Sequence, residues 1–412
     1  MDTWTMKYVI FLADGMADLP NKELDNKTPL EIAYHPAMDR MAREGYFGLT
    51  KTVPDNMPAG SDTANLSVFG YDPTACYTGR SPLEAVSLGI ELCDTDVTYR
   101  CNLVTLSEAE SIEDAIMLDY SAGEIDSNSA KELIESIGHE FEELGVKLYP
   151  GVSYRNCLLV PNGERGGEQT PPHDISEKPV KGKLPKGANS ELLRKISEWS
   201  YKELKKHPIN IWRAKHNKPM ANCLWFWGEG IKPNIESYSS KFGIDKGAVI
   251  SAVDLIQGIG KCAGLEVIKV EGATGNYTTD FAAKGRAAID VLRGGAEFVY
   301  IHVEAPDECG HHGQYDEKIW SIEQIDQKVI APVLDYLDSC NEPYAALVMP
   351  DHPTPLSIKT HTADPVPFAL YFSDGRLGAS GTEHYTEAAA AATGVFEAKA
   401  HNLMHIMTSK TE

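Results

Sequence analysis

The chain has 412 residues, of which 42% are hydrophobic and 24% are charged, a composition that is typical of a folded globular protein and excludes a disordered or fibrous one. Its 38 basic and 60 acidic residues give a formal net charge of −22, which argues against nucleic acids and anionic membrane surfaces as partners. No apolar run approaches the ~18 residues that a membrane-spanning helix needs. The eight cysteines form no CxxC pair, so we expect reduced thiols packed in the interior of a cytoplasmic protein.

Apolar strands alternate with helices at both ends of the chain. Residues 7–13 form a continuous apolar run that predicts a buried strand. Thr28 and Pro29 are typical of a helix cap and first helical residue, and this helix is expected to run to Gly45. Further predicted elements are strands over 297–303 and 345–349, with an amphipathic helix over 319–337 between them. This alternation indicates an α/β fold with a mostly parallel sheet covered on both faces.

The middle of the chain is more polar and richer in loops. It contains a predicted helix over 190–206 and a predicted strand over 222–226. Strands of the first kind resume only after this segment. We therefore interpret 77–247 as a smaller inserted α+β domain that binds the substrate, and 1–76 with 248–412 as the catalytic core.

Three predicted strands end in side chains that can bind metal ions. The carboxyl ends of the strands in an α/β sheet are where ligands bind, so these side chains are expected to meet. Mixed Asp and His ligation suits Zn²⁺ or Mn²⁺, and six such ligands suffice for two ions. His302 and His312 flank the group and are expected to be structural or to support the ligands. The six candidate ligands are Asp14, Asp307, His311, Asp351, His352 and His361.

A short turn over 58–60 leads into a helix at Ser61. One interpretation is that Ser61 is only a helix cap, because serine is favoured at that position. The other is that Ser61 is a nucleophile. Helix N-termini stabilise anions, and a bound metal ion would lower the pKa of the hydroxyl. In that case Gly60 would let the backbone approach a phosphoryl group closely.

Taken together, these motifs resemble the cofactor-independent phosphoglycerate mutases of archaeal type, within the alkaline phosphatase superfamily. The likeness covers nearly the whole chain. It is most specific in Ala59-Gly-Ser-Asp-Thr-Ala-Asn65 and His361-Thr-Ala-Asp-Pro-Val-Pro367. It implies an alkaline-phosphatase-like three-layer core and an isomerase of glycolysis and gluconeogenesis. Such an enzyme interconverts 3-phosphoglycerate and 2-phosphoglycerate through a phosphoserine, without 2,3-bisphosphoglycerate.

The resemblance also implies roles for single residues. Ser61 matches the serine that is phosphorylated, and Lys284 matches a lysine beside the phosphoryl group. Two divalent ions (Mn²⁺, Zn²⁺ or Mg²⁺) are implied, one held by Asp14, Ser61, Asp351 and His352 and the other by Asp307, His311 and His361. The small phosphorylated acid is expected to be bound by Arg100 and Arg155, with Arg213 as a weaker candidate.

The inserted segment departs from the family in ways that favour an alternative. Tyr154 stands where relatives commonly have histidine, and residues 119–124 carry acidic groups. The same phosphotransfer could therefore serve another small hydroxyl acceptor, as in a homoserine kinase. A simple phosphatase or phosphodiesterase, and a non-catalytic metal-stabilised scaffold, are further alternatives.

Overall fold

A computed structural model describes residues 6–409, and the chain divides into two compact units. Unit 1 comprises Met1–Tyr77 and Ile235–Glu412, and unit 2 comprises Thr78–Asn234. The sequence placed the end of the inserted segment at 247, but residues from 235 onward pack with unit 1. Tyr238, in this stretch, is buried, and its ring lies 4.9 Å from that of Phe298.

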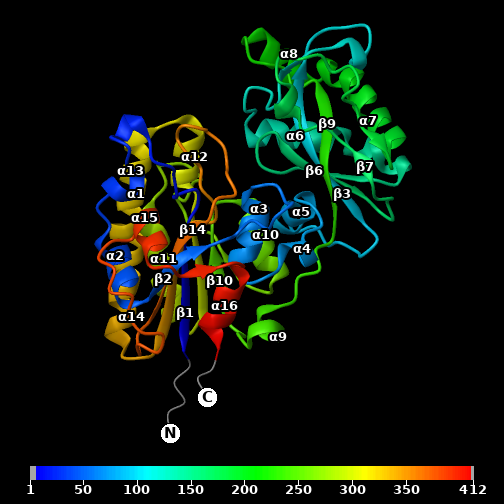
Figure 1. The fold of residues 1–412 in the computed structure, drawn as a ribbon. Coiled ribbons are helices and arrows are strands. Elements are labelled where there is room, and N and C mark those ends of the chain that lie inside the picture. Colours follow the sequence, from blue (N-terminus) through cyan, green and yellow to red (C-terminus); the bar gives the residue numbers. More distant parts are fainter. Residues whose placement is uncertain (1–5, 410–412) are drawn as a thin grey trace. The chain divides into compact units, whose positions relative to one another are not determined.

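Unit 1 is built on an eight-stranded sheet with the order β11-β10-β12-β1-β13-β14-β2-β15 (Figure 1). Only β14 runs antiparallel to its neighbours, so the predicted mostly parallel sheet is confirmed. In the centre of the sheet, Phe11 pairs with Ile301 on one side and with Val348 on the other. The strands are β1 Lys7–Ala13, β2 Tyr46–Thr50, β10 Gly247–Ile250, β11 Glu266–Ile268, β12 Phe298–Val303, β13 Tyr344–Met349, β14 Val366–Phe372 and β15 Phe396–Glu397.

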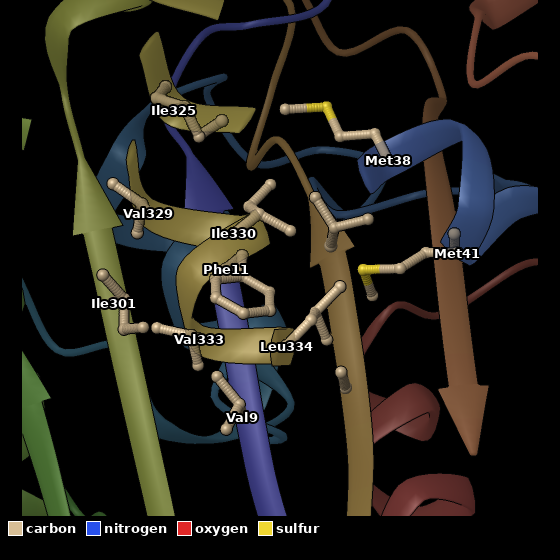
Figure 2. Packing of buried hydrophobic residues seen from close by; sticks show 14 of the residues in the cluster. Val9, Phe11, Met38, Met41, Ile301, Ile325, Val329, Ile330, Val333 and Leu334 are labelled. Carbon is tan, nitrogen blue, oxygen red and sulfur yellow. The ribbon is translucent and has the colours of Figure 1, made fainter. Parts of the chain in front are cut away.

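Helices cover both faces of this sheet (Figure 1). On one face, Val9 and Phe11 of β1 and Ile301 of β12 pack against apolar side chains such as Val333 and Leu334 (Figure 2). Alternate residues point to the other face, where the ring of Tyr300 stacks on that of Phe69 at 4.0 Å. The α-helices are α1 Pro29–Ile32, α2 Pro36–Glu44, α3 Ser61–Val68, α4 Pro73–Cys76, α9 Tyr238–Phe242, α10 Asp254–Cys262, α11 Phe281–Arg293, α12 Ala305–His312, α13 Tyr315–Ile325, α14 Ala331–Cys340, α15 Glu387–Ala392 and α16 His401–Thr408. A 3₁₀ turn, Lys22–Leu24, precedes them.

Proline divides one of the predicted helices and follows a π turn in another. Thr28 caps α1 in a capping box with Glu31, but α1 ends at Ile32, and α2 begins separately at Pro36. Proline disfavours a helical conformation in the residue before it, and His35 has φ −139°. The predicted helix 319–337 is confirmed as a continuous helical run, which consists of α13, a π turn over Asp326–Ile330 and α14. Pro332 follows this turn and lacks the N–H that a regular helix would use.

Unit 2 is built on an antiparallel sheet with the order β4-β3-β6-β5, in which β9 also pairs with β3. Its strands are β3 Val97–Leu106, β4 Met117–Asp119, β5 Lys147–Tyr149, β6 Arg155–Val160 and β9 Cys223–Ile231, with a separate pair formed by β7 Gly167–Glu168 and β8 Lys186–Gly187. Its α-helices are α5 Ser81–Ser87, α6 Ser127–Gly138, α7 Ser190–Glu203 and α8 Pro208–Lys215. Its 3₁₀ turns are Ile112–Asp114, His139–Leu144, Pro172–Ile175 and Leu204–Lys206. The predicted helix and strand of this segment correspond to α7 with the last of these turns, and to β9.

No helix among residues 6–409 is long and apolar enough to cross a membrane. All eight cysteines are free of disulfide bonds. Five of them are buried, whereas Cys93 is exposed and Cys262 and Cys340 are half-buried, so the expected interior packing holds for most thiols but not for all.

Candidate active site

The six candidate metal ligands lie in two groups at the carboxyl ends of neighbouring strands. Asp14 follows β1, which is central in the sheet, and its neighbours β12 and β13 lead to the other segments. Within each group the possible donor atoms lie within 4.8 Å of one another. The first group is Asp14, Asp351 and His352, and the second is Asp307, His311 and His361.

The two groups adjoin each other. The rings of His352 and His361 have centroids 4.0 Å apart, although the residues belong to different groups. In the second group, Asp307 lies between two imidazoles, with its oxygens 3.3 Å from His311 Nε2 and 3.4 Å from His361 Nε2. The chain therefore brings all six predicted ligands into one continuous cluster.

Gly15 makes this close approach possible. Its φ is +61°, and its backbone N–H donates to Asp351 Oδ1 at 3.1 Å. A Cβ at this position would lie 2.6 Å from the Cα of Asp307 and 2.6 Å from Thr354 Oγ1. Only glycine fits here without displacing the loop that carries Asp14 from the helix that carries Asp307.

Burial and mutual repulsion perturb the charges of the cluster. Burial, together with the nearby Asp351 and Asp307 carboxylates, raises the pKa of Asp14 well above its usual value. Burial alone would also raise the pKa of Asp307, but hydrogen bonds with His311 and His361 hold it well below its usual range. The bond to Asp307 raises the pKa of His311 to about 9. Several carboxylates are thus buried close together, an arrangement that a bound cation would stabilise.

The donor atoms fit divalent cations. Asp14 Oδ1 is buried and has no hydrogen-bond partner among residues 6–409, while Oδ2 lies 2.9 Å from His302 Nε2. The Nε2 atoms of His311 and His361 lie 2.9 Å from each other. Two imidazole nitrogens beside one carboxylate are typical ligands of Zn²⁺ or Mn²⁺.

Ser61 is the first residue of α3 and lies beside the first group. Its Oγ is 3.1 Å from His352 Nε2. Gly60, and not Ser61, is the N-cap residue of α3, and this helix end has no side-chain cap hydrogen bond. The interpretation of Ser61 as a helix cap therefore does not account for its contact with His352. Gly60 has φ −179°, an extended conformation open to any residue, so its backbone angles do not require glycine.

Several supporting residues were not predicted. Asn65 donates to Asp351 Oδ2 at 2.8 Å and to the Ser61 carbonyl at 2.9 Å, and it accepts from the Tyr300 hydroxyl at 2.7 Å. Thr354 Oγ1 hydrogen-bonds to Asp307 Oδ1. Asn65 follows Ser61 by four residues and therefore shares its helix face, a signal that the sequence offered. No comparable spacing identified Tyr300 or Thr354.

His302 contacts the cluster directly, and Lys284 contacts His302. His302 is buried, and its Nδ1 lies 3.0 Å from Ser251 Oγ. Because its Nε2 contacts Asp14, His302 connects Ser251 to Asp14. The Lys284 ammonium is also buried and donates to the His302 carbonyl at 3.2 Å. Burial lowers the pKa of Lys284 to about 8, although the carboxylate of Glu304 opposes this shift. His312, by contrast, is exposed and contacts Glu308.

The three predicted arginines of unit 2 differ in their surroundings. Arg100 is buried, with its guanidinium carbon 4.1 Å from the Trp227 ring centroid and Nε 2.8 Å from Glu84 Oε2. The other carboxylate oxygen of Glu84 accepts a 2.9 Å hydrogen bond from Arg80, which was not predicted. Burial lowers the pKa of Arg100 to about 10; the Glu84 carboxylate opposes this shift, and the positive charges of Arg80 and Arg155 contribute to it. Arg80 and Arg100 thus contact the same carboxylate. Arg155 is exposed, with its guanidinium carbon 4.6 Å from the Tyr154 ring centroid, and its positive charge acts on Glu84 from a distance.

Arg213 has a different environment. It is buried and donates to the carbonyls of Pro219 at 2.7 Å and Ala122 at 2.5 Å. Ala122 has φ +50°, so Arg213 holds a turn of unusual backbone conformation. These bonds favour a structural role, and we do not include Arg213 among the proposed substrate contacts.

Comparison with known proteins identifies relatives of this chain. A family model described as 2,3-bisphosphoglycerate-independent phosphoglycerate mutase matches residues 42–210. The protein of that name from Methanosarcina mazei is 47% identical over 371 residues, which cover 90% of this chain and 91% of the relative. That from Methanosarcina barkeri is 45% identical over 404 residues, covering 98% and 99%. A solved structure of a protein from Pyrococcus horikoshii is 30% identical, covers 100% of both chains and has a TM-score of 0.82.

The identities and coverage decide between the alternatives that the sequence left open. The two Methanosarcina relatives align with this chain over almost their full length, and both are named as mutases. A homoserine kinase is not supported. This chain belongs to the family of 2,3-bisphosphoglycerate-independent phosphoglycerate mutases.

Proposed function

We propose that this chain interconverts 3-phosphoglycerate and 2-phosphoglycerate through a phosphoserine at Ser61, without 2,3-bisphosphoglycerate. Family membership supports the overall reaction. The observation that carries the residue assignment is the Ser61 hydroxyl, 3.1 Å from His352 Nε2, at the start of a helix and beside a buried Asp and His cluster. The positive end of the helix dipole favours a phosphoryl anion at this position.

Two divalent cations complete the proposed site, with Mn²⁺, Zn²⁺ and Mg²⁺ as candidates. When bound, such ions lower the pKa of a nearby hydroxyl and neutralise charge on phosphoryl oxygens. The first ion would be held by Asp14, Ser61, Asp351 and His352, and the second by Asp307, His311 and His361.

The reaction itself requires two phosphoryl transfers. Ser61 Oγ loses its proton and attacks phosphorus, so that the serine O–P bond forms and the bond to the 3-oxygen of glycerate breaks, with that oxygen taking up a proton. The 2-hydroxyl of the retained glycerate then attacks the phosphoserine in the reverse sense. No water is consumed. Asn65 supports both steps because it fixes the Ser61 backbone and Asp351 together.

The arginine cluster of unit 2 is proposed to bind the carboxylate of the acid. Arg80, Arg100 and Arg155 supply three positive charges against the single negative charge of Glu84. Planar guanidinium groups match carboxylate oxygens in pairs. Glu84 and Trp227 hold Arg100 from two sides and so reduce the entropy that binding would otherwise cost.

The reaction is tested most directly by following ³¹P resonances of 3-phosphoglycerate with purified protein and Mn²⁺. We expect the 2-phosphoglycerate resonance to grow to an equilibrium ratio while little inorganic phosphate forms. Inorganic phosphate as the main product would instead show a phosphatase and contradict the mutase proposal.

Replacing Arg100 separates acid binding from phosphoryl transfer. In Arg100→Ala, we expect KM for 3-phosphoglycerate to rise about 10- to 100-fold, the value of a charge-assisted hydrogen bond. The fraction of turnovers that release inorganic phosphate should also rise, because glycerate is lost before the second transfer. Arg165→Ala is the matched control, since Arg165 is an exposed arginine of the same unit, and its kinetics should equal those of the wild type. An unchanged KM in Arg100→Ala would remove Arg100 from the acid site.

Lys284 should set the alkaline limb of the pH profile. Burial lowers its pKa to about 8, so its ammonium is protonated below that pH and neutral above it. Because only the ammonium attracts a phosphoryl anion, kcat/KM is expected to fall as pH rises through about 8. Lys284→Arg, which stays protonated, should shift this limb beyond the measurable range, and Lys284→Met should lower kcat/KM at every pH. A limb near pH 8 that persists in both variants would assign it to another group.

A further inference from the structure

A buried ion pair behind the cluster has no part in the chemistry proposed so far. Lys318, on α13, and Asp18 have fully buried side chains, and Lys318 Nζ lies 2.8 Å from Asp18 Oδ2. Burying two opposite charges is costly unless further hydrogen bonds satisfy both groups. The additional partners of this pair are therefore informative.

Those partners belong to the segments that carry the candidate metal ligands. Lys318 Nζ also donates to the carbonyl of Thr354 at 2.9 Å and lies 3.4 Å from that of Ala17. Asp18 Oδ2 accepts from the backbone N–H of Leu356 at 3.2 Å. One ammonium thus joins the loop after β1, which contains Asp14, to the loop after β13, which contains Asp351 and His352.

Thr354 connects this pair to both ligand groups. Its Oγ1 hydrogen-bonds to Asp307 Oδ1 and lies 3.3 Å from His352 Nδ1. Its carbonyl is also approached by α12, where a Cβ on Gly310 would lie 2.4 Å from that oxygen. Lys318 therefore fixes the backbone of the residue whose hydroxyl orients one ligand from each group.

We propose that Lys318 and Asp18 are positioning residues that hold the two metal-binding loops in register, and that Thr354 transmits their effect to Asp307 and His352. This inference rests on the proposed function only in taking the cluster to bind divalent cations. Groups that orient metal ligands without touching the metal commonly change affinity about 10- to 100-fold when removed. Lys318→Met keeps the length of the side chain and removes its donors.

The test measures Mn²⁺ binding to the full chain by titration calorimetry and by the loss of the free-ion electron paramagnetic resonance signal. In Lys318→Met the Mn²⁺ dissociation constant should rise about 10- to 100-fold. The double variant Lys318→Met/Asp18→Asn removes the unpaired buried charge, so its thermal stability should recover in part while its Mn²⁺ affinity stays low. A merely structural role would restore both properties together and would overturn the proposal.

Asp326→Asn is the matched control. Asp326 is a buried carboxylate directly after α13, and its oxygens accept from the backbone N–H groups of Ala37 and Met38. This variant should lower stability and leave Mn²⁺ affinity at the wild-type value. Amide hydrogen exchange without metal supplies a second measurement, and Thr354 and Leu356 should exchange faster in Lys318→Met. Unchanged exchange and unchanged Mn²⁺ affinity, or a wild-type chain that binds no Mn²⁺, would refute the positioning role. Mn²⁺ binding without mutase activity would instead refute the proposed function alone.

Discussion

Replacing Ser61 with alanine is expected to reduce mutase activity by at least about 10⁴-fold, because the proposed reaction has no route without the hydroxyl that receives the phosphoryl group. The substitution removes one oxygen from a half-buried side chain, so the fold should tolerate it. Acid-quenched wild-type protein should carry a phosphoryl group on the peptide that contains Ser61, as detected by mass spectrometry, and the variant should carry none.

Ser67→Ala provides the comparison on the same helix. Ser67 is buried and its hydroxyl donates only to the Thr52 carbonyl among its hydrogen bonds in the described part of the chain. Its loss should cost roughly 1 kcal/mol of stability and leave both activity and phosphoprotein formation unchanged. Full activity in Ser61→Ala would return Ser61 to the role of a helix residue and exclude a phosphoserine mechanism at this position.

Much of unit 1 could be predicted because strong local signals agreed with the fold. The apolar run 7–13 forms β1 over the same residues, and its burial on both faces leaves little choice of position. The candidate ligands could be grouped because parallel strands deliver their carboxyl ends to one edge, which makes spatial neighbours of residues more than 300 apart, such as Asp14 and Asp351.

The predictions failed where a proline or a long-range contact decided the outcome. Pro36 divides the helix that was predicted from Pro29 to Gly45 into α1 and α2. The end of the inserted segment was predicted at 247 because the sequence between 235 and 247 is polar. In the structure unit 2 ends at Asn234, and Tyr238 packs into unit 1. Periodicity reports which face of a helix is buried but not which element covers it.

The supporting network of the site was the least predictable part. Lys318 and Thr354 occupy ordinary positions in a helix and a loop, and nothing local distinguishes them from exposed polar residues. Their burial and their shared hydrogen bond exist only after α13 has packed against the two loops. The candidate ligands could be recognised in the sequence by residue type, whereas the groups that contact them are determined by tertiary structure.

Replacing Gly15 with alanine should damage both the fold and the cluster of candidate ligands. The φ of +61° disfavours alanine by about 1 to 2 kcal/mol, and a Cβ 2.6 Å from Asp307 Cα adds overpacking of about 1 to 3 kcal/mol. The added Cβ would meet Asp307 Cα, Asp307 Oδ1 and Thr354 Oγ1, each at 2.6 Å, so relief requires the segments that carry Asp14 and Asp307 to move apart. Displacements near 1 Å in such sites cost about 100-fold in rate. Chemical denaturation, Mn²⁺ titration and mutase assays should all register the change.

Gly375→Ala separates the two causes of that loss. Gly375 has φ +71° in an exposed loop after β14, and a Cβ there would meet nothing within 4 Å. It therefore carries the backbone cost alone, about 1 to 2 kcal/mol, with Mn²⁺ affinity and activity unchanged. If Gly15→Ala lost no more stability than Gly375→Ala and kept its affinity for Mn²⁺, the close contact between the Asp14 loop and α12 would not determine the geometry of the cluster. The larger loss expected in Gly15→Ala follows from two ligand-bearing segments that are close enough for a single methyl group to separate.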